Sequence, residues 1–105
     1  MLEAFQPQGN TMILTVTTTG TPAVQPSTGS IMGARIANLG GAIAYFAIGQ
    51  SSTTFAVLPS SGTPANGIPI ASGGVETFNL GPNFYLSAIT SAGTATLSIT
   101  PGFGA

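Results

Sequence analysis

Residues 33–49 read GARIANLGGAIAYFAIG, and this stretch decides the fold class. Its first half belongs to the run Ser30–Asn38, where small or apolar side chains at even positions alternate with a second face that carries Arg35. A period of two residues is typical of a β-strand. Its second half, Ala42–Ile48, is apolar throughout and predicts a central strand covered on both faces. The Gly40-Gly41 pair between them predicts a tight hairpin turn.

Outside this stretch, glycines and prolines separate further short runs rich in β-branched and aromatic residues, as in other strands. A helix is disfavoured because each glycine or proline in its interior costs roughly 1 or 3 kcal/mol. We therefore expect an all-β chain, an antiparallel and jelly-roll-like β-sandwich of about seven short strands with no substantial helix. The expected strands are Thr11–Thr19, Ser30–Asn38, Ala42–Ile48, Thr53–Leu58, Val75–Leu80, Phe84–Thr90 and Ala95–Thr100.

The length of 105 residues fits one such domain, which we expect over residues 11–105 behind an N-terminal arm at residues 1–10. Between the fourth and fifth predicted strands lies Pro59–Gly74, the longest irregular segment, with a primed turn expected at Asn66-Gly67. A loop of this length in a compact domain tends to be functional or mobile. We expect Phe46, Phe55, Phe78 and Phe84 in the core, and Tyr45 and Tyr85 nearer the surface.

Charged residues make up only 3% of the chain, and they are Glu3, Arg35 and Glu76. Histidine, cysteine, aspartate, lysine and tryptophan are absent, so most side chains that transfer protons, activate nucleophiles or bind metals are missing. We expect no enzymatic activity and no cofactor. One arginine cannot build the basic surface that binds nucleic acid, and the longest apolar run is far shorter than the ~20 residues of a membrane helix. The N-terminus does not resemble a signal peptide, so folding in a cytosol is expected.

Arg35 and Glu76 are the only charges within predicted strands. A single buried charge carries a penalty of several kcal/mol. We therefore predict a structural ion pair between them across two strands. The alternative is that both are independent and solvated, since exposed ion pairs add little stability.

The shortage of charge also concerns the exterior. Charged side chains keep the surface of a free protein hydrated and mutually repulsive, whereas the cores of interfaces are depleted of charge. None of the predicted strands carries a lysine or an inward-pointing charge that would discourage edge pairing. We therefore expect much of the exterior to be an interface.

Several segments resemble small virion proteins of tailed bacteriophages. The similarity spans roughly residues 30 to 104 and is carried by glycine turns and strand ends. The segments are Arg35–Gly40, Ala44–Gly49, Gly67–Phe78, Ala88–Leu97 and Thr100–Gly102. The resemblance implies a capsid decoration or cement protein, a small β-sandwich bound outside the shell of the major capsid protein. It further implies synthesis in the cytoplasm of a host bacterium and a final location on the outer capsid surface of the virion.

Such a protein would act through protein–protein contacts, and two segments are candidates for them. The arm Met1–Asn10 is expected to dock on a neighbouring subunit or on the shell through Leu2, Phe5 and Pro7. The long loop offers Pro64, Asn66 and Ile68 as a second contact. We expect a homotrimer, because threefold positions of an icosahedral shell favour it, with monomers at other lattice points as the alternative. The competing function is a fibre, spike or adhesin domain that holds a host glycan with its tyrosines and loop.

Overall fold

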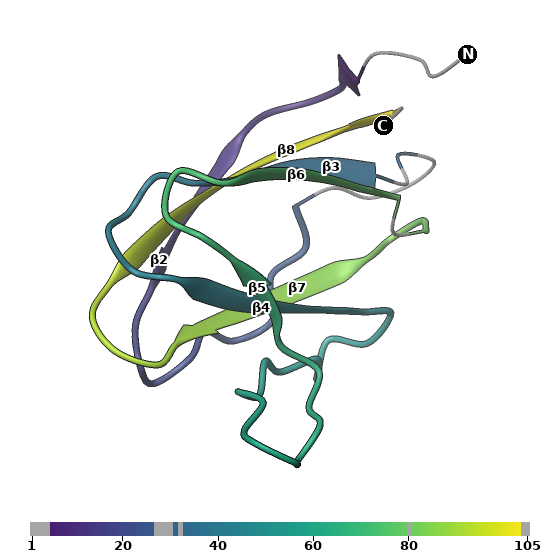
Figure 1. The fold of residues 1–105 in the computed structure, drawn as a ribbon. Helices are drawn as coiled ribbons and strands as arrows, with labels where there is room; N and C mark the ends of the chain where they lie inside the picture. The colour runs from purple at the N-terminus through teal and green to yellow at the C-terminus, as the bar shows by residue number, and fades with distance from the viewer. Residues whose placement is uncertain (1–4, 27–30, 32, 80, 104–105) are drawn as a thin grey trace.

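The structure is a computed structural model that describes residues 5–26, 31, 33–79 and 81–103. Two antiparallel sheets lie face to face, and no helix occurs in these ranges, so none is present that could span a membrane (Figure 1). The all-β sandwich expected from the sequence is confirmed. Sheet A contains β1 (Gln6–Pro7), β2 (Met12–Val16), β3 (Gly33–Asn38), β6 (Val75–Asn79) and β8 (Ala95–Phe103); sheet B contains β4 (Ala44–Gly49), β5 (Ile68–Ile70) and β7 (Tyr85–Thr90).

The strand order is that of a jelly roll. Sheet A runs β2-β8-β3-β6, and β1 pairs with the end of β8 on the same side as β2. Sheet B runs β5-β4-β7, and an isolated bridge from Val24 to Leu86 adds one more position beyond β7. From β2 onward the chain passes to the other sheet at each connection except that between β4 and β5, as it does in a jelly roll.

The core lies between the two sheets and is built from the inward face of each strand. In β2 the inward side chains are Met12, Leu14 and Val16, in agreement with the alternation in the sequence. Phe46 of β4 meets Phe78 of β6 edge to face, with ring centroids 5.0 Å apart, and this contact ties sheet B to sheet A. The fully buried aliphatic and aromatic side chains include Val16, Ile36, Phe46, Phe84, Leu86, Leu97 and Ile99.

The predicted hairpin at Gly40-Gly41 is wrong, because β3 and β4 belong to different sheets. Neither glycine has the positive φ that a primed hairpin turn requires. β3 pairs instead with β6 and β8, while β4 pairs with β5 and β7. The segment between them is therefore a corner at which the chain leaves sheet A and enters sheet B.

Asn38, the last residue of β3, organises this corner, and its side chain is fully buried. Its Nδ2 group donates to the carbonyl oxygen of Ala42 at 2.8 Å and to that of Ile70 at 3.0 Å. Its Oδ1 atom accepts from the backbone N–H of Gly40 at 3.0 Å. One amide thus joins the end of β3, the corner and β5, and leaves none of its own polar groups unpaired at a site shielded from water.

The predicted strand Thr53–Leu58 is also wrong, although its side chains alternate between more exposed and more buried positions as those of a strand do. The segment crosses the outer face of sheet B, where the N–H of Ala56 donates to Oγ of Ser87 at 3.0 Å. Ala56 is buried between this segment and sheet B, whereas Phe55 is 47% exposed. The prediction that Phe55 belongs to the core is therefore wrong. Here side chains, rather than a partner strand, accept the hydrogen bonds of the backbone. A strand-like sequence does not reveal whether the segment pairs with another strand or is bound by side chains.

The long irregular loop is shorter than expected. β5 lies inside Pro59–Gly74, and Asn66-Gly67 does not form a primed turn because neither residue has a positive φ. At the other end of the chain, β8 continues past Thr100 to Phe103. The fold therefore has more short strands than the sequence pattern indicates, and β1 and β5 are the two that it did not reveal.

We expect Asn38→Leu to lower the free energy of unfolding by about 3 kcal/mol, because one buried and two part-buried backbone groups lose their partner. Urea unfolding followed by tyrosine fluorescence measures the change. Thr11→Ala is the control, since it removes only the exposed hydroxyl bond to Thr100 and should cost less than about 0.5 kcal/mol. Equal midpoints for the two variants would contradict the role assigned to Asn38.

Candidate interaction surface

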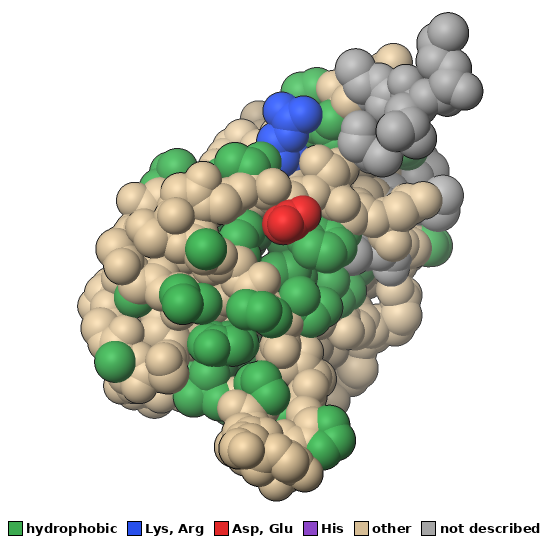
Figure 2. Space-filling model, viewed as in Figure 1, with side chains coloured by type: hydrophobic (Ala, Val, Ile, Leu, Met, Phe, Trp, Pro, Cys, Tyr) green, Lys and Arg blue, Asp and Glu red, His purple; other side chains and the backbone are tan. Residues whose placement is uncertain are grey.

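The two strand charges do not meet. The β3–β6 register places Arg35 opposite Thr77 and Ile36 opposite Glu76. Directly opposite residues share a face of the sheet, so alternation sends the side chains of Arg35 and Glu76 to opposite faces. The guanidinium carbon of Arg35 lies 4.6 Å from the ring centroid of Phe5 instead. Figure 2 shows the two charges as separate spots, and no ion pair joins them, so the predicted pair is not formed.

Phe5 brings the N-terminal arm onto its own domain. Its ring is 8% exposed and packs over Gly102, where an added Cβ would lie 2.6 Å from the ring. Pro7 is exposed and pairs with Gly102 as part of β1. Phe5 is therefore not free to dock on a neighbour as expected, because Arg35 and β8 already cover it. Leu2 lies outside the described residues.

The loop between β4 and β5 is held in one shape by a side-chain amide. Asn66 Oδ1 accepts from the N–H of Val57 at 2.7 Å, and its Nδ2 donates to the carbonyl of Phe55 at 2.9 Å. Ser60 and Thr63 exchange two backbone hydrogen bonds at 3.1 and 2.9 Å. Asn66 is therefore a tether of the loop. Figure 1 shows this segment projecting from the end of sheet B, away from the sandwich.

Two of the other contact candidates are open to solvent. Pro64 sits in the projecting loop and is exposed, and Ile68, at the start of β5, is 41% exposed. Neither has a charged residue beside it in the sequence. The loop thus presents a shaped, uncharged surface.

The outer face of sheet A is a second surface with little charge. The registers align Ile13, Ser98, Ala37 and Val75 in one row that crosses β2, β8, β3 and β6. Its two ends are Ile13, 58% exposed, and Val75, 56% exposed. Arg35 is the single charge on the face. We define the outer face of sheet A as Ile13, Thr15, Arg35, Ala37, Val75, Thr77, Asn79, Thr96, Ser98 and Thr100.

Sequence reasoning did not single out these surface residues, although the signal was present for one of them. The alternation of the first strand places Ile13 on the same side as Thr15, which is the polar side. Val75 and Phe55 gave no such signal, because the residues two positions away from them do not sort into one polar and one apolar face in the sequence. Further large apolar side chains are exposed at Leu39, Ile43, Phe55, Val57 and Phe103.

The hydroxyl groups nearest the interior serve the structure. Ser87 Oγ donates to the carbonyl of Thr21 at 2.7 Å, and Thr21 Oγ1 accepts from the N–H of Ala88 at 3.0 Å. Within the described ranges, no three His, Cys, Asp or Glu side chains gather where they could hold a metal ion.

Comparisons of the chain with models of protein families, with characterised proteins and with solved structures find no match.

We expect Phe5→Ala to detach β1 from the end of β8, because the ring that packs over Gly102 and Arg35 is lost. The loss of stability should be about 3 kcal/mol, and the amide of Gln8, which donates to Pro101, should exchange faster with solvent. Hydrogen exchange followed by NMR measures both. Gln6→Ala, which truncates an exposed side chain, should leave exchange at Gln8 unchanged; similar exchange in both variants would refute this role of the ring.

We expect Asn66→Ala to loosen the projecting loop, because Val57 and Phe55 lose their partners. Loss of two hydrogen bonds should raise the population of the open loop about tenfold. Limited proteolysis with an enzyme that cleaves after small residues measures this at Pro59–Gly67. Ser61→Ala is the control on the same loop, and equal cleavage rates for the two variants would contradict the tether.

Proposed function

We propose that this chain is a non-enzymatic structural protein of a bacteriophage virion, one that decorates and stabilises the outside of the capsid through protein–protein contacts. The observation that carries the proposal is an exterior with two charges in its described part and eight exposed large apolar side chains. A surface of this kind is cheap to desolvate, since few charges have to leave water. A surface with so few charges suits a protein that acts while packed against other proteins in an assembly.

The fold is compatible with this role but does not select it. Jelly rolls occur in viral capsid proteins and also in lectins, and function has to be argued from the surface rather than from the fold. Exposed apolar residues that stand singly are normal in soluble proteins. Here two of them end one row on the outer face of sheet A, and the face around them contains a single charge.

The projecting loop is the proposed contact with the major capsid protein. Asn66 fixes its shape before binding, so little conformational entropy is lost on contact. Pro64 within the loop and Ile68 at the start of β5 supply exposed, uncharged surface. Many weak contacts of this kind, repeated over a lattice, add up to strong attachment. We further propose that the protein works as a homotrimer at threefold positions of the shell.

The glycan-binding alternative lacks a supporting observation. Tyr45 and Tyr85 are both half-buried, and no open aromatic platform is formed by them. Neither residue lies in the projecting loop. The alternative is kept as an outcome of the test below.

The test is an electron cryomicroscopy map of the particle, together with virions from which the gene has been deleted. The proposal requires copies in lattice positions on the outer shell, and heads that rupture more readily when the protein is missing. Normal heads with reduced adsorption to host cells would reject the proposal and support glycan recognition. A virion that contains no copies would reject both.

Within that system, the double variant Pro64→Asp and Ala65→Asp should reduce capsid occupancy at least about tenfold, which corresponds to roughly 1.4 kcal/mol. Two unpaired carboxylates would have to be desolvated in the contact. Ser91→Asp, in the exposed turn before β8, is the control and should bind normally. Quantitative mass spectrometry of purified virions gives the copy number, and equal occupancy of the two variants would rule out the loop as the contact.

A further inference from the structure

The sandwich has four sheet edges, and the two of sheet B are closed. The chain at Thr21–Val24 runs along β7, where Val24 and Leu86 exchange two backbone hydrogen bonds at 2.8 Å.

On β7, the N–H of Thr90 donates to Thr17, away from β4, so Ala44, which lies opposite Thr90, turns its backbone groups toward β5. Ala44 and Ile70 therefore face each other, and the backbone groups of the next residue, Pro69, face the open side. Proline has no N–H to offer there, and this is a common way to block an edge strand.

The two edges of sheet A are open within the described part of the chain. Backbone groups point alternately to the two sides of a strand. On β3, the N–H of Asn38 donates to Gly74, so even-numbered residues of β3 and β6 face one another and Val75, Thr77 and Asn79 face outward.

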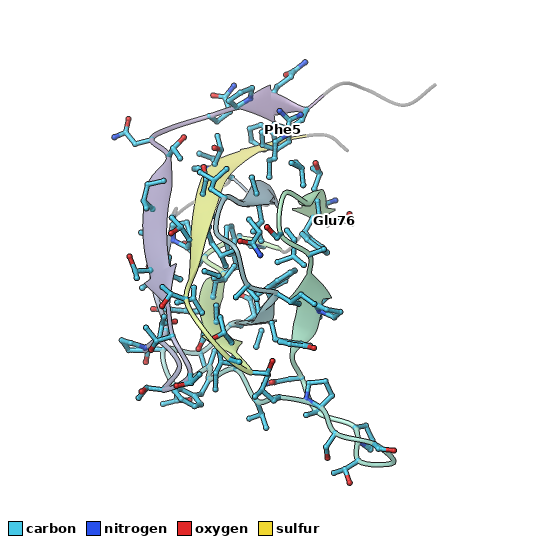
Figure 3. The ribbon with its side chains drawn as sticks, turned by 60° about the vertical axis from the view of Figure 1, so that its left-hand side comes forward. Phe5 and Glu76 are labelled. Atoms are coloured by element: carbon cyan, nitrogen blue, oxygen red, sulfur yellow. The ribbon has the colours of Figure 1, made fainter. Side chains whose placement is uncertain are left out.

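The β2 edge follows from the same alternation. The N–H of Leu39 donates to Thr96, which places the even-numbered groups of β8 toward β3 and its odd-numbered groups toward β2. Their partners in β2 are Met12, Leu14 and Val16. The backbone groups of Ile13 and Thr15 therefore face outward, and Figure 3 shows β2 at the margin of the sandwich.

We propose that these two edges bind each other in different copies, so that β6 of one copy pairs antiparallel with β2 of the next. The strand directions fit. Each pair in the order β2-β8-β3-β6 is antiparallel, so β2 and β6 run in opposite directions and a second copy in the same orientation continues the pattern. Edge pairing of this kind satisfies backbone groups that otherwise face only water.

The side chains fit as well. The residues whose backbone faces outward on both strands are odd-numbered, and all of their side chains lie on the outer face of sheet A. If the row Ile13, Ser98, Ala37, Val75 continues across the joint, Val75 meets Ile13 of the next copy. These are two highly exposed β-branched side chains, and cross-strand pairs of this type stabilise sheets.

Charge does not oppose the joint on this face. Neither Ile13 and Thr15 nor Val75, Thr77 and Asn79 are charged. Glu76 lies on the inner-face side of β6, so the expectation that no edge strand carries an inward charge is wrong; its exposed position leaves the carboxylate in solvent (Figure 3). The Glu76 carboxylate limits how tightly the β6 edge pairs, but it does not block the outward-facing backbone groups of Val75, Thr77 and Asn79.

Because the joint uses two different edges, it leaves one free edge at each end and closes only as a ring. The edge-to-edge joint rests on the self-association in the proposed function and gives it a geometry. The joint is tested with purified protein alone and the capsid role with virions, so either proposal can fail while the other stands.

The test removes one backbone donor from each edge. Thr77→Pro and Ile13→Pro delete an N–H that faces outward, at positions where an edge strand tolerates proline. Thr77→Val and Ile13→Val keep the N–H and serve as matched controls. Sedimentation velocity gives the oligomeric state of each variant, and urea unfolding verifies that each is folded.

We expect oligomers for the wild type and both valine variants, and monomers for each proline variant. An equimolar mixture of the two proline variants should form dimers and nothing larger, because one intact β6 edge meets one intact β2 edge. Hydrogen exchange in the wild type should protect the amides of Ile13 and Thr77 as concentration rises.

Three results would overturn the inference. One is a wild type that stays monomeric up to about 1 mM, where even a weak affinity would be visible. Another is that one proline variant still assembles as well as the wild type, which indicates pairing of like edges. The last is loss of assembly in a folded valine variant, which places the contact in the side chain rather than in the backbone edge.

Discussion

The buried amide of Asn38 is the interaction on which the arrangement of the two sheets depends. A chain that leaves one sheet and enters another has to bend, and backbone groups at the bend lose their ladder partners. In this protein Asn38 supplies both donors and an acceptor at that point, to Ala42, Ile70 and Gly40. Because nearly no charged residues are available, a neutral amide makes these three connections.

Charged residues are scarce on the surface as well. Hydroxyl groups and short apolar side chains cover the outer face of sheet A, and the one cation there rests on the ring of Phe5. Sheet B closes its edges with Thr21–Val24 and Pro69, whereas no strand among the described residues covers either edge of sheet A. This asymmetry gives the molecule a direction along which copies can add.

Alternation of side chains predicted much of the fold. The strands at β2, β3, β4, β6, β7 and β8 each overlap a predicted run, recognised either from its alternation or from β-branched and aromatic residues between turn residues. The candidate contacts fared less evenly. Phe5 is covered by its own domain and Asn66 holds a loop, while Pro64 and Ile68 are exposed as expected. The type of a residue does not reveal whether its side chain is covered by its own domain or left exposed for a partner.

By itself the sequence determined the class of the fold, the apolar face of the first strands and the scarcity of charge, since these depend on local periodicity and composition. The tertiary structure alone decided which strands are neighbours. Arg35 and Glu76 lie on adjacent strands yet leave opposite faces, because the register offsets them by one residue. Phe55 lies in a run with the composition of a strand, yet it faces solvent, and side chains of Ser87 and Asn66 take the place of a partner strand for the backbone there. Pairing and register join residues far apart in the chain, and no local pattern records them.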